Sequence, residues 1–238
     1  MNLYENELNA LKKANRLRVR EVFDENLIDL ASNDYLGLAE NKFLLEKACS
    51  TICTYKYHSP KASMLVNGTH KIHKSFENAL CIANGFEDGV IVGSGFLANI
   101  ALIEALVRKD DVLFIDEEYH ASGMLATRLH NRKHIIVFKH NDYLDLEQKM
   151  DSCVSSGRKI VAIEGIYSMS GDVAKKEIFE IVDKYQAILI CDEAHSSGVI
   201  GENLTGIFDY YSIKPKSNHI KMGTLGKAYG SYGAYILG

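Results

Sequence analysis

The chain has 238 residues, of which 47% are hydrophobic and 24% are charged, and it contains two prolines. This composition is typical of an ordered globular protein with one large core or two small ones. The formal net charge of −4 argues against the strongly basic surface with which proteins bind nucleic acids. Five cysteines without a CxxC pair predict neither a disulfide framework nor a metal site. We find no signal peptide and no membrane-length apolar run, so we expect a cytoplasmic protein that does not bind membranes.

Residues 1–40 are expected to form an N-terminal helical and extended segment. The first twenty residues have the spacing of a helix, residues 28–30 are expected to be extended, and a polar turn follows at 32–37. Residues 41–238 are expected to form the large domain. It begins with two amphipathic helices, near 42–55 and 70–83.

Short aliphatic runs follow at regular spacing, at 90–92, 112–115, 135–138, 160–163 and 187–190. Each run is apolar throughout, which indicates strands buried on both faces of a parallel sheet. Helical segments are expected between them, at 96–107, 143–154 and 175–184. Two later strands, at 219–223 and 233–237, leave little room for a crossover helix, so we expect the last to run antiparallel. The sequence therefore predicts an α/β fold with a mostly parallel seven-stranded sheet flanked by helices.

Ligands of such sheets bind beyond the carboxyl ends of the strands, and two residues expected there stand out. Lys227 lies in a Gly-rich turn, Thr224-Leu225-Gly226-Lys227-Ala228-Tyr229-Gly230. A lysine amine in such a turn can form a Schiff base with a carbonyl cofactor. Asp192, at the end of a predicted buried strand, can keep a pyridinium nitrogen protonated. Together the two residues favour an enzyme that uses pyridoxal phosphate (PLP).

The segment Gly93-Ser94-Gly95-Phe96 lies between a predicted strand and a predicted helix. Its glycines let the backbone approach a ligand, and the helix N-terminus offers free N–H groups to a phosphate. The same residues, followed by Asp116 about twenty positions later, also match the fingerprint of dinucleotide-binding proteins. An NAD(P)-dependent oxidoreductase therefore remains an alternative.

Asp192-Glu193-Ala194-His195 also has the form of the DEAH box of nucleic-acid-dependent ATPases. That function needs a phosphate loop of the type GxxxxGK[ST], and Gly226-Lys227 is followed by alanine. Metal binding by Asp192 and His195 has no second carboxylate–histidine set to support it. We therefore predict neither an ATPase nor a metal site.

Seven short motifs occur in an order that identifies a family. They are residues 32–38 (SNDYLGL), 93–99 (GSGFLAN), 120–122 (HAS), 140–142 (HND), 164–169 (EGIYSM), 192–195 (DEAH) and 224–227 (TLGK). In this set the chain resembles, over nearly its whole length, the α-oxoamine synthases. These are fold-type I PLP enzymes that condense an amino acid with an acyl thioester and release CO2.

The resemblance implies roles for individual residues. Lys227 would bind PLP covalently and later move protons at the substrate α-carbon, with Asp192 on the pyridine nitrogen. His120 would stack on the ring and orient the substrate, while Arg18 would meet the carboxylate of the acyl donor. Lys227, His120 and Asp192 are thus the expected catalytic residues. The full set of expected cofactor contacts is Ser94, Gly95, Phe96, His120, Ser168, Asp192, His195 (ring oxygen), Thr224 and Lys227.

Within the family, the best match is to members that condense L-alanine with pimeloyl-CoA or a pimeloyl carrier protein in biotin biosynthesis. Glycine C-acetyltransferase and the other family reactions remain alternatives. The resemblance also implies a homodimer. Family members continue into a small C-terminal domain, which we expect to be missing here because the chain stops at Gly238. A non-enzymatic alternative is therefore an inactive remnant that acts as a folded or dimerising module.

Overall fold

The computed structural model describes residues 3–238, and the chain divides into two compact units after Ser32. The first unit contains one helix, α1 (Glu5–Lys13), with acidic residues in its first turn and basic residues in its last. This placement of charge complements the helix dipole. The helix is shorter than predicted, since Asn15 already has a left-handed φ of 51°. Residues 28–30, expected to be extended, form no strand. The sequence predicts a boundary after residue 40, and the structure divides into its two units after Ser32.

The second unit, Asn33–Gly238, begins with the two predicted helices. Helix α2 (Lys42–Cys53) starts at Asn41, whose side chain accepts a hydrogen bond from the backbone of Leu44 at 3.1 Å. A π-helical turn (Met64–Gly68) leads to α3 (Lys71–Asn84). Helix α3 ends at Gly85, which has a left-handed φ of 74°. The predictions near 42–55 and 70–83 are confirmed.

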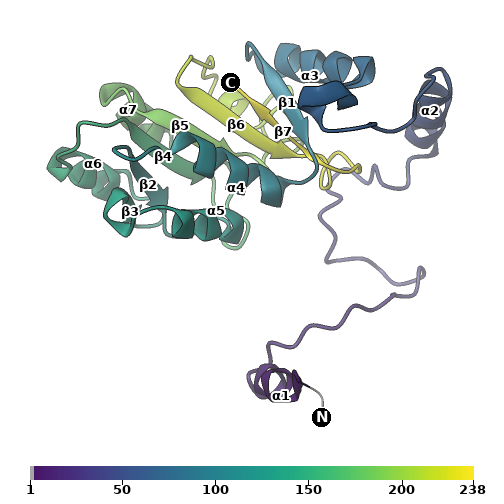
Figure 1. The fold of residues 1–238 in the computed structure, drawn as a ribbon, viewed down its shortest axis with the longest axis horizontal. Helices are drawn as coiled ribbons and strands as arrows, with labels where there is room; N and C mark the ends of the chain where they lie inside the picture. The colour runs from purple at the N-terminus through teal and green to yellow at the C-terminus, as the bar shows by residue number, and fades with distance from the viewer. Residues whose placement is uncertain (1–2) are drawn as a thin grey trace. The chain divides into compact units, whose positions relative to one another are not determined.

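A seven-stranded sheet forms the centre of this unit (Figure 1). Its order is β1-β7-β6-β5-β4-β2-β3, and β7 runs in the direction opposite to the other six strands. The mostly parallel sheet with an antiparallel last strand is therefore confirmed. The strands are β1 (Gly89–Val92), β2 (Val112–Asp116), β3 (Ile135–Phe138), β4 (Lys159–Glu164), β5 (Ile188–Asp192), β6 (His219–Thr224) and β7 (Ala234–Leu237).

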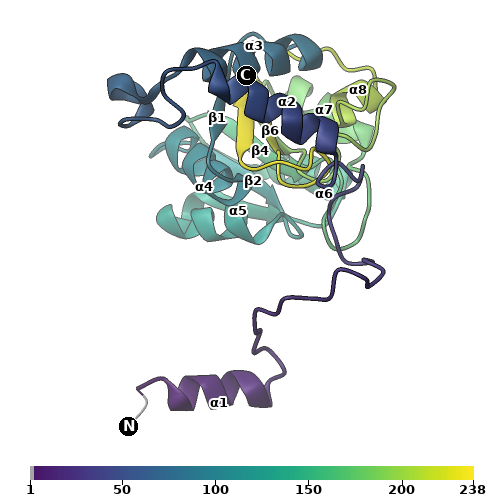
Figure 2. The ribbon, with the colours of Figure 1, turned by 90° about the vertical axis from the view of Figure 1, so that its right-hand side faces the viewer.

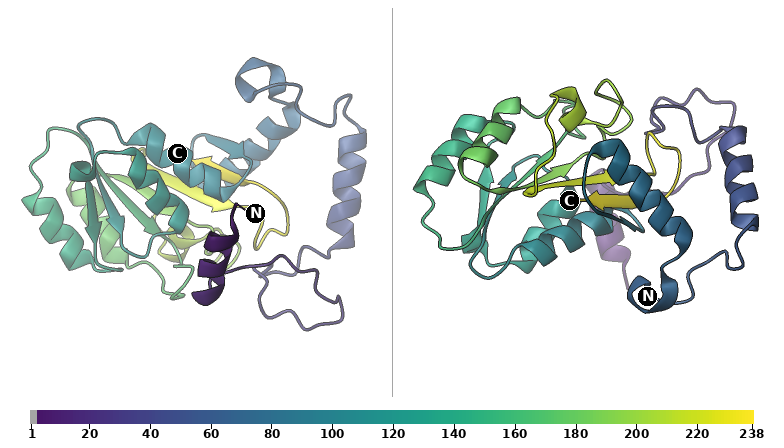
Figure 3. Two further views of the ribbon diagram at one scale, coloured as in Figure 1. Left: turned by 60° about the horizontal axis from the view of Figure 1, so that its bottom comes forward. Right: turned by 90° about the horizontal axis from the view of Figure 1, so that it is seen from above.

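Helices cover both faces of the sheet, as Figures 2 and 3 show. Since side chains alternate along a strand, neighbouring residues of β2 enter different cores. Leu113 and Ile115 pack in the core that contains residues of α4 and α5. Phe114 packs in the core that contains residues of α3, α6 and α7. These helices are α4 (Gly95–Leu106), α5 (Ala121–Ala126), α6 (Tyr143–Ser152), α7 (Lys176–Lys184) and α8 (Ile207–Tyr210), with 3-10 turns at Thr127–Leu129 and Arg132–His134.

Of the helices within residues 3–238, none has the length and apolar character needed to cross a membrane. The topology matters for function because β4, β5 and β6 are adjacent and parallel. Their carboxyl ends therefore lie at one edge of the sheet, and the end of β6 lies next to Gly95 at the N-terminus of α4. Polar residues from four distant parts of the sequence meet at this edge.

Candidate active site

A cavity of about 160 Å³ lies at the carboxyl ends of these three strands. It brings together seven of the predicted site residues, from four different segments of the chain. Ser94 and Ser168 do not line it, and Arg18 belongs to the other unit. The lining residues are Gly95, Phe96, Asn99, His120, Glu164, Asp192, Ala194, His195, Met222, Thr224 and Lys227.

Asp192, the last residue of β5, is only 3% exposed, and both of its oxygens accept hydrogen bonds. Oδ2 accepts from the side-chain amide of Asn99 at 2.7 Å, and Oδ1 accepts from the backbone of Ala194 at 2.9 Å. Burial raises the pKa of Asp192, while these two donors and the nearby Lys227 amine lower it. The carboxylate is thus buried, oriented and provided with donors.

Asn99, on α4, is the centre of a buried hydrogen-bond chain. The hydroxyl of Tyr119 donates to its Oδ1 at 2.8 Å, and its Nδ2 also donates to Oγ of Ser122 at 3.0 Å. Burial raises the pKa of Tyr119 well above its usual value, so its hydroxyl stays a donor. Because Oδ1 accepts from Tyr119, the Asn99 amide must present its NH2 group to Asp192.

His120 caps the start of α5 and is reached by the same chain. Its Nδ1 accepts from the backbone of Ser122 at 3.3 Å and lies 2.7 Å from Oγ of Ser122. Since Oγ of Ser122 accepts from Asn99, its own proton is free to go to Nδ1 of His120. The imidazole therefore carries its hydrogen on Nε2. The chain fixes the His120 ring relative to Asp192.

Lys227 follows β6, and its amine lies 2.6 Å from Nε2 of His195. Burial lowers the pKa of Lys227, while the carboxyl groups of Asp192 and Glu164 raise it. Burial, followed by the charge of Lys227, lowers the pKa of His195 to about 4. His195 is therefore neutral at physiological pH and can accept a hydrogen bond from the lysine ammonium.

His195 is held on its other side by Tyr35, whose hydroxyl lies 2.7 Å from Nδ1. The same hydroxyl donates to Oδ1 of Asn33 at 3.0 Å. A neutral imidazole donates from one nitrogen only. When the lysine is an ammonium, one assignment satisfies every contact. Lys227 donates to Nε2, Nδ1–H donates to Tyr35, and Tyr35 donates to Asn33.

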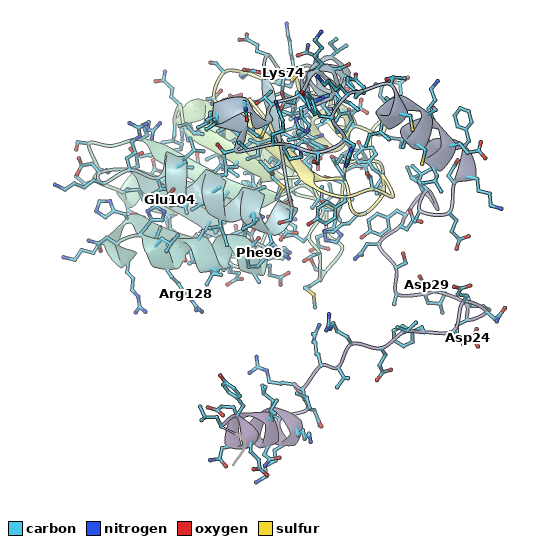
Figure 4. All side chains as sticks on the ribbon, turned by 45° about the vertical axis from the view of Figure 1, so that its right-hand side comes forward. Asp24, Asp29, Lys74, Phe96, Glu104 and Arg128 are labelled. Carbon is cyan, nitrogen blue, oxygen red and sulfur yellow. The ribbon has the colours of Figure 1, made fainter. Side chains whose placement is uncertain are left out.

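The N-terminus of α4, where Figure 4 labels Phe96, also lines the cavity. Ser94 caps this helix, because its hydroxyl accepts from the backbone of Leu97 at 3.3 Å. Earlier N–H groups of a first turn have no acceptor within the helix, so they suit an anion. A Cβ atom on Gly95 would lie 3.7 Å from Cβ of Thr224, which places the helix end against the end of β6.

Thr224 and Ser168 have structural contacts of their own. The hydroxyl of Thr224 donates to the carbonyl of Gly233 at 3.2 Å and accepts from the backbone of Gly226 at 3.4 Å. It thus holds the turn that carries Lys227. The backbone of Ser168 donates to Oε2 of Glu164 at 3.1 Å, which ties its loop to the cavity wall.

The dinucleotide alternative requires a carboxylate that is free to bind a ribose. Asp116 is fully buried and already bonded through both oxygens. Oδ1 accepts from the backbone of Glu118 and faces His140, while Oδ2 accepts from the backbone of Asn141 and from Tyr167. The sequence therefore matches the dinucleotide fingerprint, but Asp116 has no free oxygen with which to bind a ribose.

The sheet order, the lysine turn and the buried aspartate together indicate a PLP-dependent enzyme fold. The chain belongs to the aminotransferase class I and II family, which matches residues 25–238. Among curated proteins it is similar to the 8-amino-7-oxononanoate synthase of Helicobacter pylori (strain ATCC 700392 / 26695), with 48% identity over 236 residues. It is also 40% identical, over 240 residues, to a putative 8-amino-7-oxononanoate synthase of Aquifex aeolicus.

These alignments cover 99% and 100% of this chain and 63% of either relative, so the chain spans less than two thirds of their length. Among solved structures, the serine palmitoyltransferase of Sphingomonas wittichii superposes with a TM-score of 0.85 at 27% identity, covering 100% of this chain and 64% of that one. The 8-amino-7-oxononanoate synthase of Francisella tularensis superposes with a TM-score of 0.73 at 27% identity, covering 90% and 59%.

Two polar residues near the site, Asn99 and Tyr35, were not predicted from the sequence. Glu164 was expected among the polar residues that end the strands, but it was given no role. A weak sequence signal exists for Asn99 and for Glu164, but not for Tyr35. Asn99 follows Gly95 by four residues and thus lies one helical turn away on the same face. Glu164 ends an aliphatic run, as Asp192 does. Tyr35 lies in the polar turn 32–37, which shows no periodicity that would place it near His195.

Proposed function

We propose that this chain binds PLP and belongs to an enzyme that condenses L-alanine with a pimeloyl thioester. The products would be 8-amino-7-oxononanoate, CO2 and the free thiol, as in the biotin-synthesis reaction for which the curated relatives are named. The observation that carries the proposal is one cavity that holds Lys227, Asp192 and the N-terminus of α4. Amine, carboxylate and anion site match the aldehyde, the ring nitrogen and the phosphate of PLP.

The chemistry that PLP supplies when bound is an electron sink for negative charge at a substrate carbon. In this chain, Asp192 would keep the ring nitrogen protonated, since a buried carboxylate beside Asn99 stabilises a positive partner. Gly95, Phe96 and Thr224 would hold the phosphate at the end of α4.

Lys227 would bond the aldehyde carbon and, once free, would take and return the proton of the substrate α-carbon. For either task the ammonium must first lose a proton. His195 accepts a hydrogen bond from this ammonium, and Tyr35 and Asn33 orient the imidazole. His120, fixed through Ser122, would lie against the ring and position the substrate.

The thioester partner is proposed from the resemblance and from the names of the relatives. Arg18 would bind the distal carboxylate of the pimeloyl group, and Ser168 would contact the polar edge of the cofactor. A homodimer in the cytoplasm belongs to the same proposal. Light scattering of the purified chain tests the dimer, and cell fractionation tests the location.

The cofactor assignment is tested by borohydride reduction of the purified chain with PLP, followed by peptide mass spectrometry. The adduct is expected on Lys227 and is expected to disappear in Lys227→Ala. Exposed Lys214 provides the control, because Lys214→Ala should leave the adduct intact. An adduct that persists at another lysine would refute the site.

The substrate assignment is tested by release of CO2 from carboxyl-labelled amino acids. L-Alanine with pimeloyl-CoA should release more than glycine with acetyl-CoA, and the reverse order would favour glycine C-acetyltransferase. An adduct on Lys227 without CO2 release from either pair would show a cofactor-binding module. The catalytic part of the proposal would then be wrong for this chain.

A further inference from the structure

Glu164 is a second buried carboxyl group in the cavity, and the mechanism above gives it no role. It is the last residue of β4, pairs in register with Asp192 on β5, and is 2% exposed. Side chains in register on adjacent strands project from the same face of the sheet. Glu164 and Asp192 therefore enter the cavity side by side.

The two oxygens of Glu164 have different surroundings. Oε2 accepts from the backbone of Ser168 at 3.1 Å. Oε1 is buried, and within residues 3–238 it has no hydrogen-bond partner. A buried polar atom without a partner costs free energy, because it has lost its hydrogen bonds to water. Its retention at a ligand cavity indicates that a ligand supplies the missing partner.

The neighbouring groups decide which carboxyl holds a proton. Asp192 accepts from the Asn99 amide and from the backbone of Ala194. Glu164 accepts a hydrogen bond from the backbone of Ser168 and, within the described residues, from no side-chain donor, while the backbone of His120 and the Lys227 amine also act to lower its pKa. Burial, followed by the charge of Asp192, raises the pKa of Glu164 to about 8. The pKa of Asp192 is raised as well, chiefly by burial. Two adjacent buried carboxyl groups do not both ionise easily, so the one with the side-chain amide donor takes the charge.

We propose that Glu164 is a neutral carboxylic acid near pH 7 and that its Oε1–H donates a hydrogen bond to the ring oxygen of bound PLP. This inference rests on the proposed function. The proton belongs on Oε1 because Oε2 already accepts from Ser168. Glu164 is thereby a cofactor-binding residue that acts as a donor and not as an anion.

The order of the strands singles out the ring oxygen. The phosphate site lies at Thr224 on β6, the nitrogen partner Asp192 ends β5, and Glu164 ends β4 on the far side. On PLP, the ring edge opposite the phosphate arm carries a methyl group and an oxygen. Of these two substituents, only the oxygen accepts a hydrogen bond.

The protonation state is tested on the wild-type chain by infrared spectroscopy. We expect the carbonyl band of a neutral carboxylic acid at pH 7, which disappears as the pH rises through about 8. Labelling with [13C-carboxyl]glutamate should shift this band, which separates a glutamic acid from Asp192. The band should also be lost in Glu164→Gln, which separates Glu164 from the buried Glu77 and Glu193. A band that is absent, or insensitive to the label, overturns the inference.

The hydrogen bond is tested through the dissociation constant of PLP in Glu164→Gln and Glu164→Ala. Glutamine keeps an uncharged donor, so it should bind PLP within about threefold of wild type at pH 7. Between pH 7 and 9 the ratio of Glu164→Gln affinity to wild-type affinity should rise about tenfold, because only the acid loses its proton. Glu104, on the outer face of α4 (Figure 4), supplies the matched control Glu104→Gln, which should show a constant ratio.

The acceptor is tested with a PLP analogue in which hydrogen replaces the ring hydroxyl. Glu164→Ala should weaken PLP binding about tenfold and leave analogue binding unchanged relative to wild type. Equal losses for both ligands, or an affinity ratio that does not change with pH, would refute the donor role. If PLP fails to bond Lys227 at all, the proposed function fails instead, and the infrared band still reports on Glu164.

Discussion

The side-chain amide of Asn99 lies 2.7 Å from Oδ2 of Asp192, joining α4 to the carboxyl end of β5. Asn99 in turn accepts a hydrogen bond from the hydroxyl of Tyr119 and donates one to Ser122, the residue that orients His120. One amide thus connects two of the three predicted catalytic residues. Helix α4, whose N-terminus is proposed to hold the phosphate, therefore also supplies a donor to Asp192.

We expect Asn99→Leu to weaken PLP binding by about tenfold or more at pH 7. Asp192 would lose a donor in a buried site, its pKa would rise further, and the charge that holds a ring nitrogen would become harder to maintain. A fluorescence titration with PLP measures this loss. Tyr119→Phe is the control, because it removes a partner of Asn99 and leaves the amide contact with Asp192. A larger loss of PLP affinity in Tyr119→Phe than in Asn99→Leu would contradict the role of Asn99 as the donor to Asp192.

The sheet was predictable because its strands are short runs of aliphatic residues. Such runs are typical of strands that are buried on both faces of a parallel sheet. The runs 112–115 and 160–163, for example, lie within β2 and β4. The short elements were not predictable. Helix α8 has four residues, too few for a helical period, and the π-helical turn at Met64–Gly68 has a backbone that side-chain patterns do not report.

The site was predictable where chemistry demands a particular residue type, as with Lys227 and Asp192. It was not predictable where the role depends on orientation. Ser94 matches a phosphate-binding position in sequence, and its hydroxyl caps α4. Asp116 matches a ribose-binding position, but its side chain already accepts hydrogen bonds from Asn141 and Tyr167. A sequence motif gives residue types at a spacing, and it does not say which neighbours have already satisfied them.

His195 should make the stability of the chain depend on pH in the acidic range. Its pKa is lowered to about 4 in the folded state, below the ordinary value of about 6.5. Between these values the unfolded chain binds a proton that the folded chain does not, so stability falls as the pH drops from about 6.5 to 4. Urea unfolding at several pH values should show this slope reduced in His195→Gln. The exposed His58 supplies the control, and a slope that His195→Gln leaves unchanged would contradict the prediction.

Gly165 follows Glu164 at a point where the backbone passes close to the Asp192–His195 segment. A Cβ atom on Gly165 would lie 2.5 Å from Oγ of Ser196 and 3.1 Å from Oε2 of Glu193. We therefore expect Gly165→Ala to destabilise the fold by about 1–3 kcal/mol, because such overpacking forces neighbours to move. Gly93→Ala is the matched control at another strand end, where no atom lies within 4 Å of the added methyl. Thermal unfolding measures both, and equal effects would show that backbone freedom, not packing, matters.

His140 lies among carboxylates that join two loops of the site. Its Nδ1 lies 3.1 Å from Oδ1 of Asp116, and its Nε2 lies 3.2 Å from Oδ2 of Asp172 and 3.6 Å from Oε2 of Glu118. Burial lowers the pKa of His140, but hydrogen bonds to Asp116 and Asp172 outweigh it and raise the pKa above the usual value. Both ring nitrogens face acceptors, which requires the charged imidazolium.

Because the folded-state pKa of His140 is raised, its contribution to stability is complete below about pH 6.5 and is lost as the pH rises through the folded-state pKa. We expect His140→Gln to lower the free energy of unfolding by about 1–2 kcal/mol at pH 6, since charged hydrogen bonds are lost from a largely buried site. At pH 9 the loss should be smaller, because the wild-type ring is then neutral too. Urea unfolding at both pH values measures the difference. Glu118→Gln, which changes the half-exposed and most distant carboxylate, should have little effect at either pH. A His140→Gln loss that is the same at pH 6 and 9 would show that the ring acts by packing on Tyr167 and not by its charge.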